Sequence, residues 1–183
     1  RPGLRSRLVL ASKVAGPSRG MPWIRGGAAD VTPADIARAC DDSLRRLQTD
    51  YIDLFQLHGY DAMTPPEEVL STLDTLVRAG KIRYWGLSNF RAWRITQAVH
   101  LARQLNMPGP VVCQPYYNLL NRQPEVEVLE CCRHLGLGVV PYSPIARGVL
   151  SGKYAPGAKP AADTRAGRGD KRILQTEFRE ESL

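Results

Sequence analysis

Short apolar runs alternate with amphipathic stretches along most of the chain. The apolar runs begin near residues 8, 51, 82, 111 and 138, and each has the length of a buried strand. The stretches between them carry apolar residues at every third or fourth position, and this spacing predicts helices. After a first long loop, each strand–helix unit takes roughly 25 to 30 residues, which is typical of a parallel sheet. The sequence therefore predicts an α/β fold.

Two helix starts use the same Thr-Pro device. In "TPAD", Thr32 is the expected N-cap, Pro33 is the first helical residue, and Asp35 completes a capping box. "TPPE" repeats the pattern, with Thr64 as the cap and Glu67 reaching back to it. Both helices are expected to begin at their prolines.

The remaining boundaries are less strongly signalled. We expect a first strand over 7–14, a helix near 91–105, a helix from Pro124, and a short helix near 173–181. Residues 155–183 lack periodicity and are rich in Ala, Gly, Arg and Pro, so they are predicted to be mostly loop. The whole chain, 1–183, is predicted to be one domain with its βα core over 7–154. Trp23, in the first long loop, is expected to pack there or to line a substrate pocket.

Each predicted strand has an apolar body and a polar carboxyl end. The polar residues at these ends are Lys13, His58, Ser88, Asn89, Gln114, Tyr142 and Ser143. A lysine or histidine at a strand end is commonly structural when it stands alone. In a parallel α/β fold, however, all these ends lie on one face, which is where active sites are built. Five consecutive polar ends therefore predict a site.

The residue types suggest what such a site binds. Amide and hydroxyl groups suit a carboxamide, and Tyr142 offers a flat ring for stacking. A lysine lowers the pKa of a neighbouring acid or binds an anion. His58 is suited to donating a hydrogen bond to a carbonyl oxygen that becomes negative. Together these groups indicate a planar heteroaromatic carboxamide beside a reducible carbonyl.

Five stretches, in order, resemble the aldo-keto reductases. They are "LVLASKV", "SLRRLQTDYIDLFQLHGYD", "RAGKIRYWGLSNF", "VCQPYYNLLNR" and "VVPYSPIARGVLSGKY". The resemblance is closer to the bacterial members and to the potassium-channel beta subunits. It implies a (β/α)8 TIM barrel that binds NADP(H) and reduces aldehydes and ketones. It also implies that the five strands are the third to seventh of eight, so that the chain is an incomplete barrel.

The resemblance assigns roles to individual residues. It implies that Lys13 and His58 are catalytic, and that Ser88, Asn89 and Gln114 hold the nicotinamide carboxamide. Tyr142 matches the residue that stacks on the nicotinamide ring. The loop along the cofactor pyrophosphate is matched by Ser143, Pro144, Ile145, Ala146 and Arg147, with Lys153 and Arg165 as further cofactor contacts.

Two members of the family's catalytic tetrad have no match here. The resemblance places an Asp and a Tyr upstream of the "ASK" strand, and no tyrosine of this chain fits that role. We therefore expect the 183 residues alone to be inactive in carbonyl reduction. The alternative is a cofactor-binding regulatory subunit resembling the channel beta subunits. His58 favours an enzyme, because those subunits tend to carry another residue there.

Composition and charge indicate which classes of binding partner are not expected. The net charge is +7, but the first 25 residues hold six basic and no acidic residues, so the excess is confined to the N-terminal part. No basic face across the fold is indicated, and we expect no nucleic-acid partner. No apolar run of 18 residues predicts a membrane span.

The cysteines point to a compartment. The four cysteines, Cys40, Cys113, Cys131 and Cys132, lack metal-ligand spacing, so no metal site is expected. Free cysteines are typical of a reducing compartment, and we expect a cytoplasmic protein. The expected partner is a small carbonyl substrate. The oligomeric state is left open.

Overall fold

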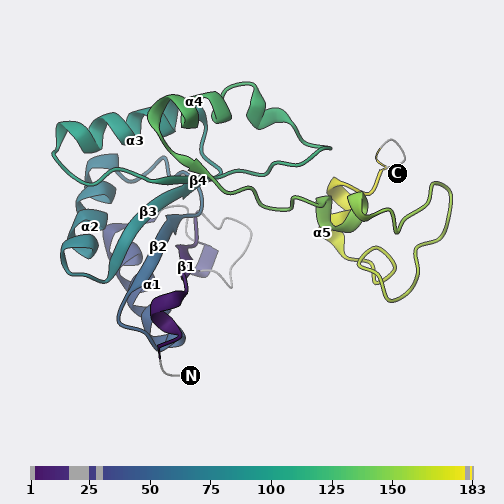
Figure 1. Ribbon diagram of the computed structural model, residues 1–183, viewed down its shortest axis with the longest axis horizontal. Coiled ribbons are helices and arrows are strands. Elements are labelled where there is room, and N and C mark those ends of the chain that lie inside the picture. Colours follow the sequence, from purple (N-terminus) through teal and green to yellow (C-terminus); the bar gives the residue numbers. More distant parts are fainter. Residues whose placement is uncertain (1–2, 17–24, 28–30, 180–181, 183) are drawn as a thin grey trace. The chain divides into compact units, whose positions relative to one another are not determined.

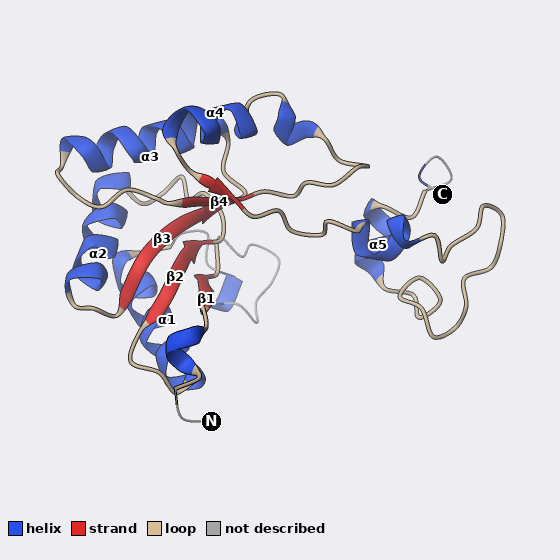
Figure 2. Ribbon diagram, in the orientation of Figure 1, coloured by secondary structure: helices blue, strands red, loops and turns tan. Residues whose placement is uncertain are grey.

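The chain forms one parallel sheet with helices between its strands (Figures 1 and 2). The computed structural model describes residues 3–16, 25–27, 31–179 and 182. Its strands are β1 (Ala11–Val14), β2 (Ile52–Leu57), β3 (Ile82–Ser88), β4 (Val112–Gln114) and β5 (Gly138–Val139). They pair in chain order and all are parallel. The predicted α/β class and parallel sheet are confirmed within the described part of the chain.

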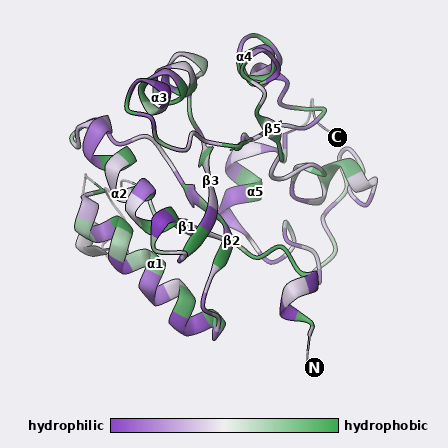
Figure 3. Cartoon of the chain, turned by 60° about the vertical axis from the view of Figure 1, so that its left-hand side comes forward, coloured by the Kyte–Doolittle hydropathy of each residue, from purple (hydrophilic) through white to green (hydrophobic). Residues whose placement is uncertain are grey.

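A helix follows each of the first four strands. The helices are α1 (Pro33–Leu47), α2 (Pro66–Arg78), α3 (Ala92–Gln104), α4 (Val128–Leu135) and α5 (Lys171–Thr176). Short 3-10 turns cover Arg5–Arg7, Arg25–Gly27, Gln123–Glu125 and Ala146–Ser151. Green and purple segments alternate along α1 in Figure 3, as expected for a helix with one apolar and one polar face.

The chain divides into two compact units. Unit 1 comprises residues 1–114 and 127–140, and unit 2 comprises residues 115–126 and 141–183. Unit 1 holds the sheet, α1 to α4 and the larger apolar core. Unit 2 has its own small core around Tyr154 and Ile173, in which the ring of Phe178 packs edge-on against Tyr154 at 5.1 Å. Each unit is therefore organised around its own buried apolar residues.

The two faces of the sheet in unit 1 differ in chemistry. Phe55 and Trp85 point to the helical side and are almost completely buried in the core. The opposite face carries Lys13 and Gln56, which are neighbours in the register of β1 and β2. Next to Gln56 on β3 is Gly86, and a Cβ added there would lie 3.5 Å from the Gln56 side chain. Successive side chains of a strand alternate between faces, so packing residues and polar residues are separated.

The predicted capping box of α1 is confirmed. The Thr32 side chain accepts a hydrogen bond from the Asp35 backbone N–H, and the Asp35 carboxylate accepts one from the Thr32 N–H. The matching prediction for α2 is wrong, because Pro65 is the N-cap and no side chain caps it. The Thr64 hydroxyl donates instead to Asp61 at 2.6 Å and is no longer directed at the helix.

Three other boundaries differ from the prediction. The first strand begins at Ala11 rather than at residue 7, because the Leu10 N–H donates to the Asp53 carboxylate instead of continuing the ladder. The helix expected from Pro124 is split, since Glu127 has an extended φ of −146° and α4 starts only at Val128.

Near the C-terminus, the short helix predicted near 173–181 is Lys171–Thr176, shifted towards its N-cap Asp170. The Asp170 carboxylate accepts from the Arg172 and Ile173 N–H groups, which fixes the helix start. Trp23 lies outside the described residues.

Gly86 allows the strands β2, β3 and β4 to pack closely on the polar face. A Cβ there would lie 2.4 Å from Val112 Cγ1 and 2.8 Å from the Val112 carbonyl oxygen. We expect Gly86→Ala to lower the free energy of unfolding by about 1–3 kcal/mol, because the backbone must shift. Urea denaturation followed by far-UV circular dichroism measures this. The matched control is Gly59→Ala, where a Cβ meets nothing within 4 Å; an equal loss in both variants would contradict the steric argument.

Candidate cofactor and catalytic site

Lys13 and His58 share the polar face of the sheet in unit 1. Lys13 is the register partner of Gln56, and His58 follows Gln56 by two residues, so all three side chains belong to one face. The His58 side chain is exposed, and that of Lys13 is half-buried. Lys13 makes no ion pair with any residue that the structure describes.

The ends of β2, β3 and β4 are tied together by hydrogen bonds. The Ser88 hydroxyl donates to the Gln114 carbonyl oxygen at 2.9 Å, and the Asn89 N–H donates to the same oxygen at 3.3 Å. The Asn89 side-chain amide donates to the His58 carbonyl oxygen at 2.8 Å. Asn89 reaches both strands because it adopts a left-handed φ of 62°. Ser88 and Asn89 thus have a structural role at the strand ends.

Gln114 has the complementary arrangement. Its backbone carbonyl oxygen is used by Ser88 and Asn89, whereas its half-buried side-chain amide makes no hydrogen bond with a described residue. A primary amide that offers both a donor and an acceptor is suited to pairing with a carboxamide. Of the three residues predicted to hold the carboxamide, Gln114 therefore has the side chain best placed to bind it.

Gln56 is a polar residue of this face that sequence reasoning missed. Its side chain is 1% exposed, and neither its Nε2 nor its Oε1 has a hydrogen-bond partner in the described part of the chain. A buried amide without partners costs free energy, so Gln56, beside Lys13, offers a donor and an acceptor that the described residues do not use. The sequence could have indicated this position. Gln56 precedes His58 by two residues, and residues two apart in a strand lie on the same face.

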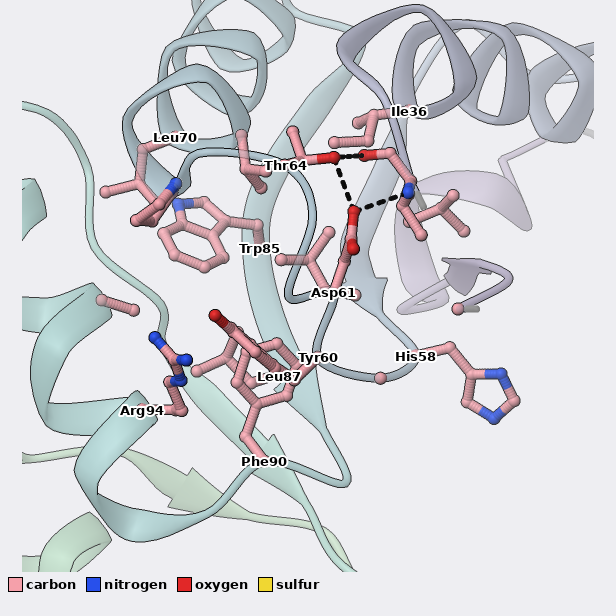
Figure 4. Close-up of a pocket in the computed structure, with 18 of the residues that line it drawn as sticks. Ile36, His58, Tyr60, Asp61, Thr64, Leu70, Trp85, Leu87, Phe90 and Arg94 are labelled. Atoms are coloured by element: carbon pink, nitrogen blue, oxygen red, sulfur yellow. Dashed lines mark hydrogen bonds between the residues drawn. The ribbon is translucent and has the colours of Figure 1, made fainter. Parts of the chain in front are cut away.

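Asp61 anchors the loop that follows His58 (Figure 4). The Asp61 carboxylate accepts hydrogen bonds from the Thr64 hydroxyl at 2.6 Å, the Val31 N–H at 2.7 Å and the Met63 N–H at 2.8 Å. Burial acts to raise the pKa of Asp61, but the three hydrogen bonds outweigh it and hold the pKa below its usual value. The carboxylate is therefore ionised at neutral pH and fixes the backbone after β2.

An apolar pocket lies on the helical side of the same strands. It is lined by Trp85 and Leu87 of β3, by Leu70 of α2 and by Phe90, and its volume is about 50 Å³. His58 and Gly59 also line this pocket, but the His58 imidazole points away from the labelled apolar cluster in Figure 4. The pocket therefore meets the candidate site only where β2 ends, and the rest of its lining is mostly apolar.

In unit 2, the predicted pyrophosphate loop is built from left-handed turns. Positive φ angles occur at Ser143 (54°), Ala146 (48°), Arg147 (55°) and Gly148 (105°). The Asn118 side-chain amide donates to the Ser143 carbonyl oxygen at 3.0 Å and holds the first of these turns. Such conformations cost free energy at non-glycine residues and cluster where a loop is shaped for binding.

The side chains of this loop fall into three groups. Pro144 and Ile145 are exposed, whereas Ala146 is fully buried in the core of unit 2. Arg147 is mostly buried and pairs with Glu177. Lys153 lies over Gly148, because a Cβ at that glycine would be 2.9 Å from the Lys153 ammonium nitrogen.

Tyr142 and Arg165 have local partners within unit 2. The Tyr142 ring stacks on that of Tyr116 at 5.3 Å with an angle of 26° between the planes. Burial raises the pKa of Tyr142, so its hydroxyl remains protonated at neutral pH. The Arg165 guanidinium is bound to the Asp170 carboxylate at 2.6 Å. Arg165 is thus tied to the start of α5, apart from the loop residues that pair with Glu177.

The predicted site residues thus form one group in each unit. Unit 1 carries Lys13, His58, Ser88, Asn89 and Gln114, and unit 2 carries the loop Tyr142–Arg147 with Lys153 and Arg165. Sequence reasoning missed the roles of Tyr116 and Glu177, which contact the loop of unit 2. No periodicity marks Glu177, because it follows a helix of only six residues.

Comparisons with known proteins show which family this chain is similar to. The model of the Aldo/keto reductase family matches residues 1–178. The chain is 42% identical over 177 residues to Protein tas of Escherichia coli (strain K12), covering 87% of this chain and 51% of that protein. It is 38% identical to an Aldo-keto reductase of Babesia bovis, covering 81% of this chain and 62% of that protein. It is 39% identical to a "Probable voltage-gated potassium channel subunit beta" of Oryza sativa subsp. japonica, covering 86% and 47%.

The chain belongs to the aldo/keto reductase family. It spans about half the length of the curated relatives it matches, from 47% to 62% of these three. Members of this family act on carbonyl compounds and generally use NAD(P)H. The five parallel strands are consistent with part of the family's (β/α)8 barrel.

In each unit taken by itself, the residues present have a chemistry that fits part of a nicotinamide dinucleotide. The Gln114 amide suits a carboxamide, and Tyr142 supplies an aromatic face. Arg147 and Lys153 supply two cations beside a loop of left-handed turns, which is the chemistry that binds phosphate.

The described residues contain no group of three or more His, Cys, Asp or Glu side chains placed to hold a metal ion. None of the helices described is long and apolar enough to cross a membrane.

The Asp61 anchor predicts a pH dependence of stability. Because the folded pKa of Asp61 lies below the unfolded value of 3.8, its contribution is present above that value and is lost as pH falls below it. We expect Asp61→Asn to lower the free energy of unfolding by about 1–3 kcal/mol at neutral pH. The difference in the free energy of unfolding between Asp61→Asn and the wild type should disappear in strong acid. Urea denaturation at several pH values measures it.

The control for this prediction is Asp50→Asn, which removes the same charge from an exposed side chain. It should change the stability little at any pH. A gap between Asp61→Asn and the wild type that stayed constant down to the acid limit would contradict the anchoring role of the ionised carboxylate.

Proposed function

We propose that this chain carries part of the active site of an NADP(H)-dependent reductase of aldehydes and ketones. The observation that carries the proposal is the shared face of Lys13 and His58 at the carboxyl edge of a parallel sheet, beside the Gln114 amide. Membership of the aldo/keto reductase family supports it, since that family acts on carbonyl compounds. The particular aldehyde or ketone is left open.

His58 and Lys13 have distinct proposed roles. The exposed imidazole of His58 donates a hydrogen bond to the substrate carbonyl oxygen and stabilises the negative charge that develops there. The ammonium of Lys13, which has no ion-pair partner in the described part of the chain, favours ionisation of a nearby proton donor by its positive charge. Neither role requires the apolar pocket on the helical side of the strands.

The proposed cofactor contacts divide between the two groups. When bound, NADPH supplies the hydride for the carbonyl carbon. The Gln114 amide, with Ser88 and Asn89 beside it, holds the carboxamide, and the Tyr142 ring stacks on the nicotinamide. The segment Ser143–Arg147, with Lys153 and Arg165, binds the phosphate-bearing part of the cofactor. The preference for NADP(H) over NAD(H) is part of this proposal.

A second candidate function is supported by a specific relative. The rice protein is named as a probable voltage-gated potassium channel subunit beta, so a cofactor-binding regulatory subunit is the alternative. The position of His58, exposed on the face of Lys13, favours the reductase, because a carbonyl-orienting donor has no purpose in a subunit that only binds.

We expect the 183-residue chain alone not to reduce carbonyls. The proposed mechanism needs a proton donor. Among the described tyrosines of unit 1, Tyr51 and Tyr84 lie near the amino ends of β2 and β3, and Tyr60 lines the apolar pocket. An assay of the purified chain with NADPH and 4-nitrobenzaldehyde, followed at 340 nm as a general NADPH readout, tests this. Turnover close to that of a full-length relative such as Protein tas would show that the chain supplies its own donor.

In an active protein that contains this chain, His58→Ala is expected to lower kcat by about 10²–10³-fold, because the donor to the oxyanion is lost. The dissociation constant for NADPH should change little, since His58 does not contact the cofactor in this proposal. The control is His134→Ala, on the exposed side of α4. A loss of NADPH affinity that matches the loss of kcat would show that His58 serves cofactor binding instead.

A further inference from the structure

Glu177 is a buried carboxylate in a segment that is otherwise mostly exposed. Its side chain is 3% exposed, and it lies between residues distant in sequence. The Tyr116 hydroxyl donates to Glu177 Oε1, and Arg147 Nε lies 3.0 Å from both carboxylate oxygens. The hydroxyl of the adjacent Thr176 contacts the second oxygen. Burying a carboxylate costs several kcal/mol unless charge and hydrogen bonds compensate, so these contacts must be held together for the segment to stay folded.

Through Tyr116, this carboxylate fixes the ring of Tyr142. The two rings are stacked, and a backbone bridge also pairs Tyr116 with Tyr142. Burial raises the pKa of Tyr116, and the hydrogen bond to Glu177 raises it further. The Tyr116 hydroxyl therefore stays protonated and keeps donating at neutral pH. A hydrogen bond at the hydroxyl fixes where the end of the Tyr116 side chain lies, and this helps to keep the ring in place against the stacked ring of Tyr142.

Glu177 also orients the guanidinium of Arg147. Only Nε of Arg147 is used by the carboxylate, and neither Nη1 nor Nη2 has a hydrogen bond with a described residue. The Arg147 side chain is 17% exposed, so its terminal nitrogens are the part left for a ligand. A guanidinium fixed at Nε presents two parallel N–H groups, which is the fork that binds a phosphate oxygen pair.

We propose that Glu177 is a positioning residue that holds Tyr142, through Tyr116, and Arg147 in the orientation that binds the dinucleotide cofactor. This inference rests on the proposed function, because it concerns the same cofactor site. Glu177 does not itself touch the cofactor. Its effect is to remove, during folding, the rotational freedom that these side chains would otherwise lose on binding.

The contact between Glu177 and Arg147 could also act in the opposite way, by inhibiting cofactor binding, and this role predicts a different result. If Glu177 occupied Arg147 in place of the cofactor phosphate, neutralising Glu177 would free the guanidinium and tighten binding. If Glu177 positions Arg147, neutralising it loosens the guanidinium and weakens binding. The sign of one measurement therefore separates a positioning residue from an inhibitory contact.

The chain contains a matched control for this carboxylate. Glu125 accepts a hydrogen bond from the Tyr117 hydroxyl and a two-point contact from Arg122, at 2.8 Å in each case. The chemistry is the same as at Glu177, but Glu125 is only half-buried, with a side chain 34% exposed, and it contacts neither Tyr142 nor Arg147. Glu125→Gln therefore reports the effect of losing a tyrosine–glutamate–arginine group without affecting the proposed site.

The experiment measures the dissociation constant of the 183-residue chain for NADPH, by titration of the cofactor's own fluorescence, in wild type, Glu177→Gln and Glu125→Gln. We expect Glu177→Gln to raise this constant about tenfold, as for the loss of a hydrogen bond to a charged group, and Glu125→Gln to leave it unchanged. Tyr116→Phe keeps the stacked ring and removes only its hydroxyl, so it should raise the constant by a smaller factor. Tyr117→Phe is its control.

Thermal unfolding separates positioning from loss of structure. Should Glu177→Gln unfold, Tyr116→Phe decides the question, because it removes no charge. One result is that the wild type binds NADPH with a dissociation constant that is the same in folded Glu177→Gln or in Tyr116→Phe. That result overturns this inference and leaves the proposed function intact. Tighter binding by Glu177→Gln overturns it in favour of an inhibitory contact. A wild-type chain that does not bind NADPH overturns the proposed function and this inference with it.

Discussion

Parallel pairing of the strands in chain order is the constraint on which the rest of unit 1 depends. It brings every carboxyl end to the same edge, so residues separated by tens of positions become neighbours across the sheet. The register places Lys13 beside Gln56 and Ser88 beside Gln114. The absence of a side chain at Gly86 lets the polar face close around Gln56 and Val112. The chemistry proposed for this face follows from the register before any single side chain is considered.

Unit 2 combines its small apolar core with a mostly buried ion pair. Its core is small, and the buried ion pair of Arg147 with Glu177 joins the turn-rich loop to the segment after α5. The left-handed turns between Ser143 and Gly148 are costly, and a buried pair that tolerates one geometry is a means of holding them. The shape of the loop and the orientation of its side chains thus have a common cause.

Sequence patterns predicted the α/β class, the chain order of the elements and the residues at the strand ends. Those features depend on periodicities of two and 3.6 residues, which are local and can be read along the chain. The failures have tertiary causes. Thr64 was predicted to cap α2 from its local sequence, but Asp61 competes for its hydroxyl across a turn. The first strand is short because Asp53, from a neighbouring strand, takes the Leu10 N–H.

The candidate site shows the same division. Lys13, His58 and Gln114 stand at strand ends and were visible in the pattern, whereas Glu177 becomes significant only through partners 30 and 61 positions away. Ser88 and Asn89 were predicted as ligand contacts, and the structure adds a role that spacing does not reveal, namely the bonds that join three strands. Hydrogen bonds of this kind have no signature in a single sequence.

The placement of the tryptophans gives unit 1 a spectroscopic signal of its own. The two described tryptophans, Trp85 and Trp93, lie in unit 1, where Trp85 is 1% exposed and its indole N–H donates to the Pro108 carbonyl oxygen, while Trp93 is 58% exposed. Tyrosines, by contrast, occur in both units, among them Tyr84 in unit 1 and the stacked pair Tyr116 and Tyr142 in unit 2. Emission excited at the red edge, which selects tryptophan over tyrosine, therefore follows the folding of unit 1 around a buried and an exposed indole.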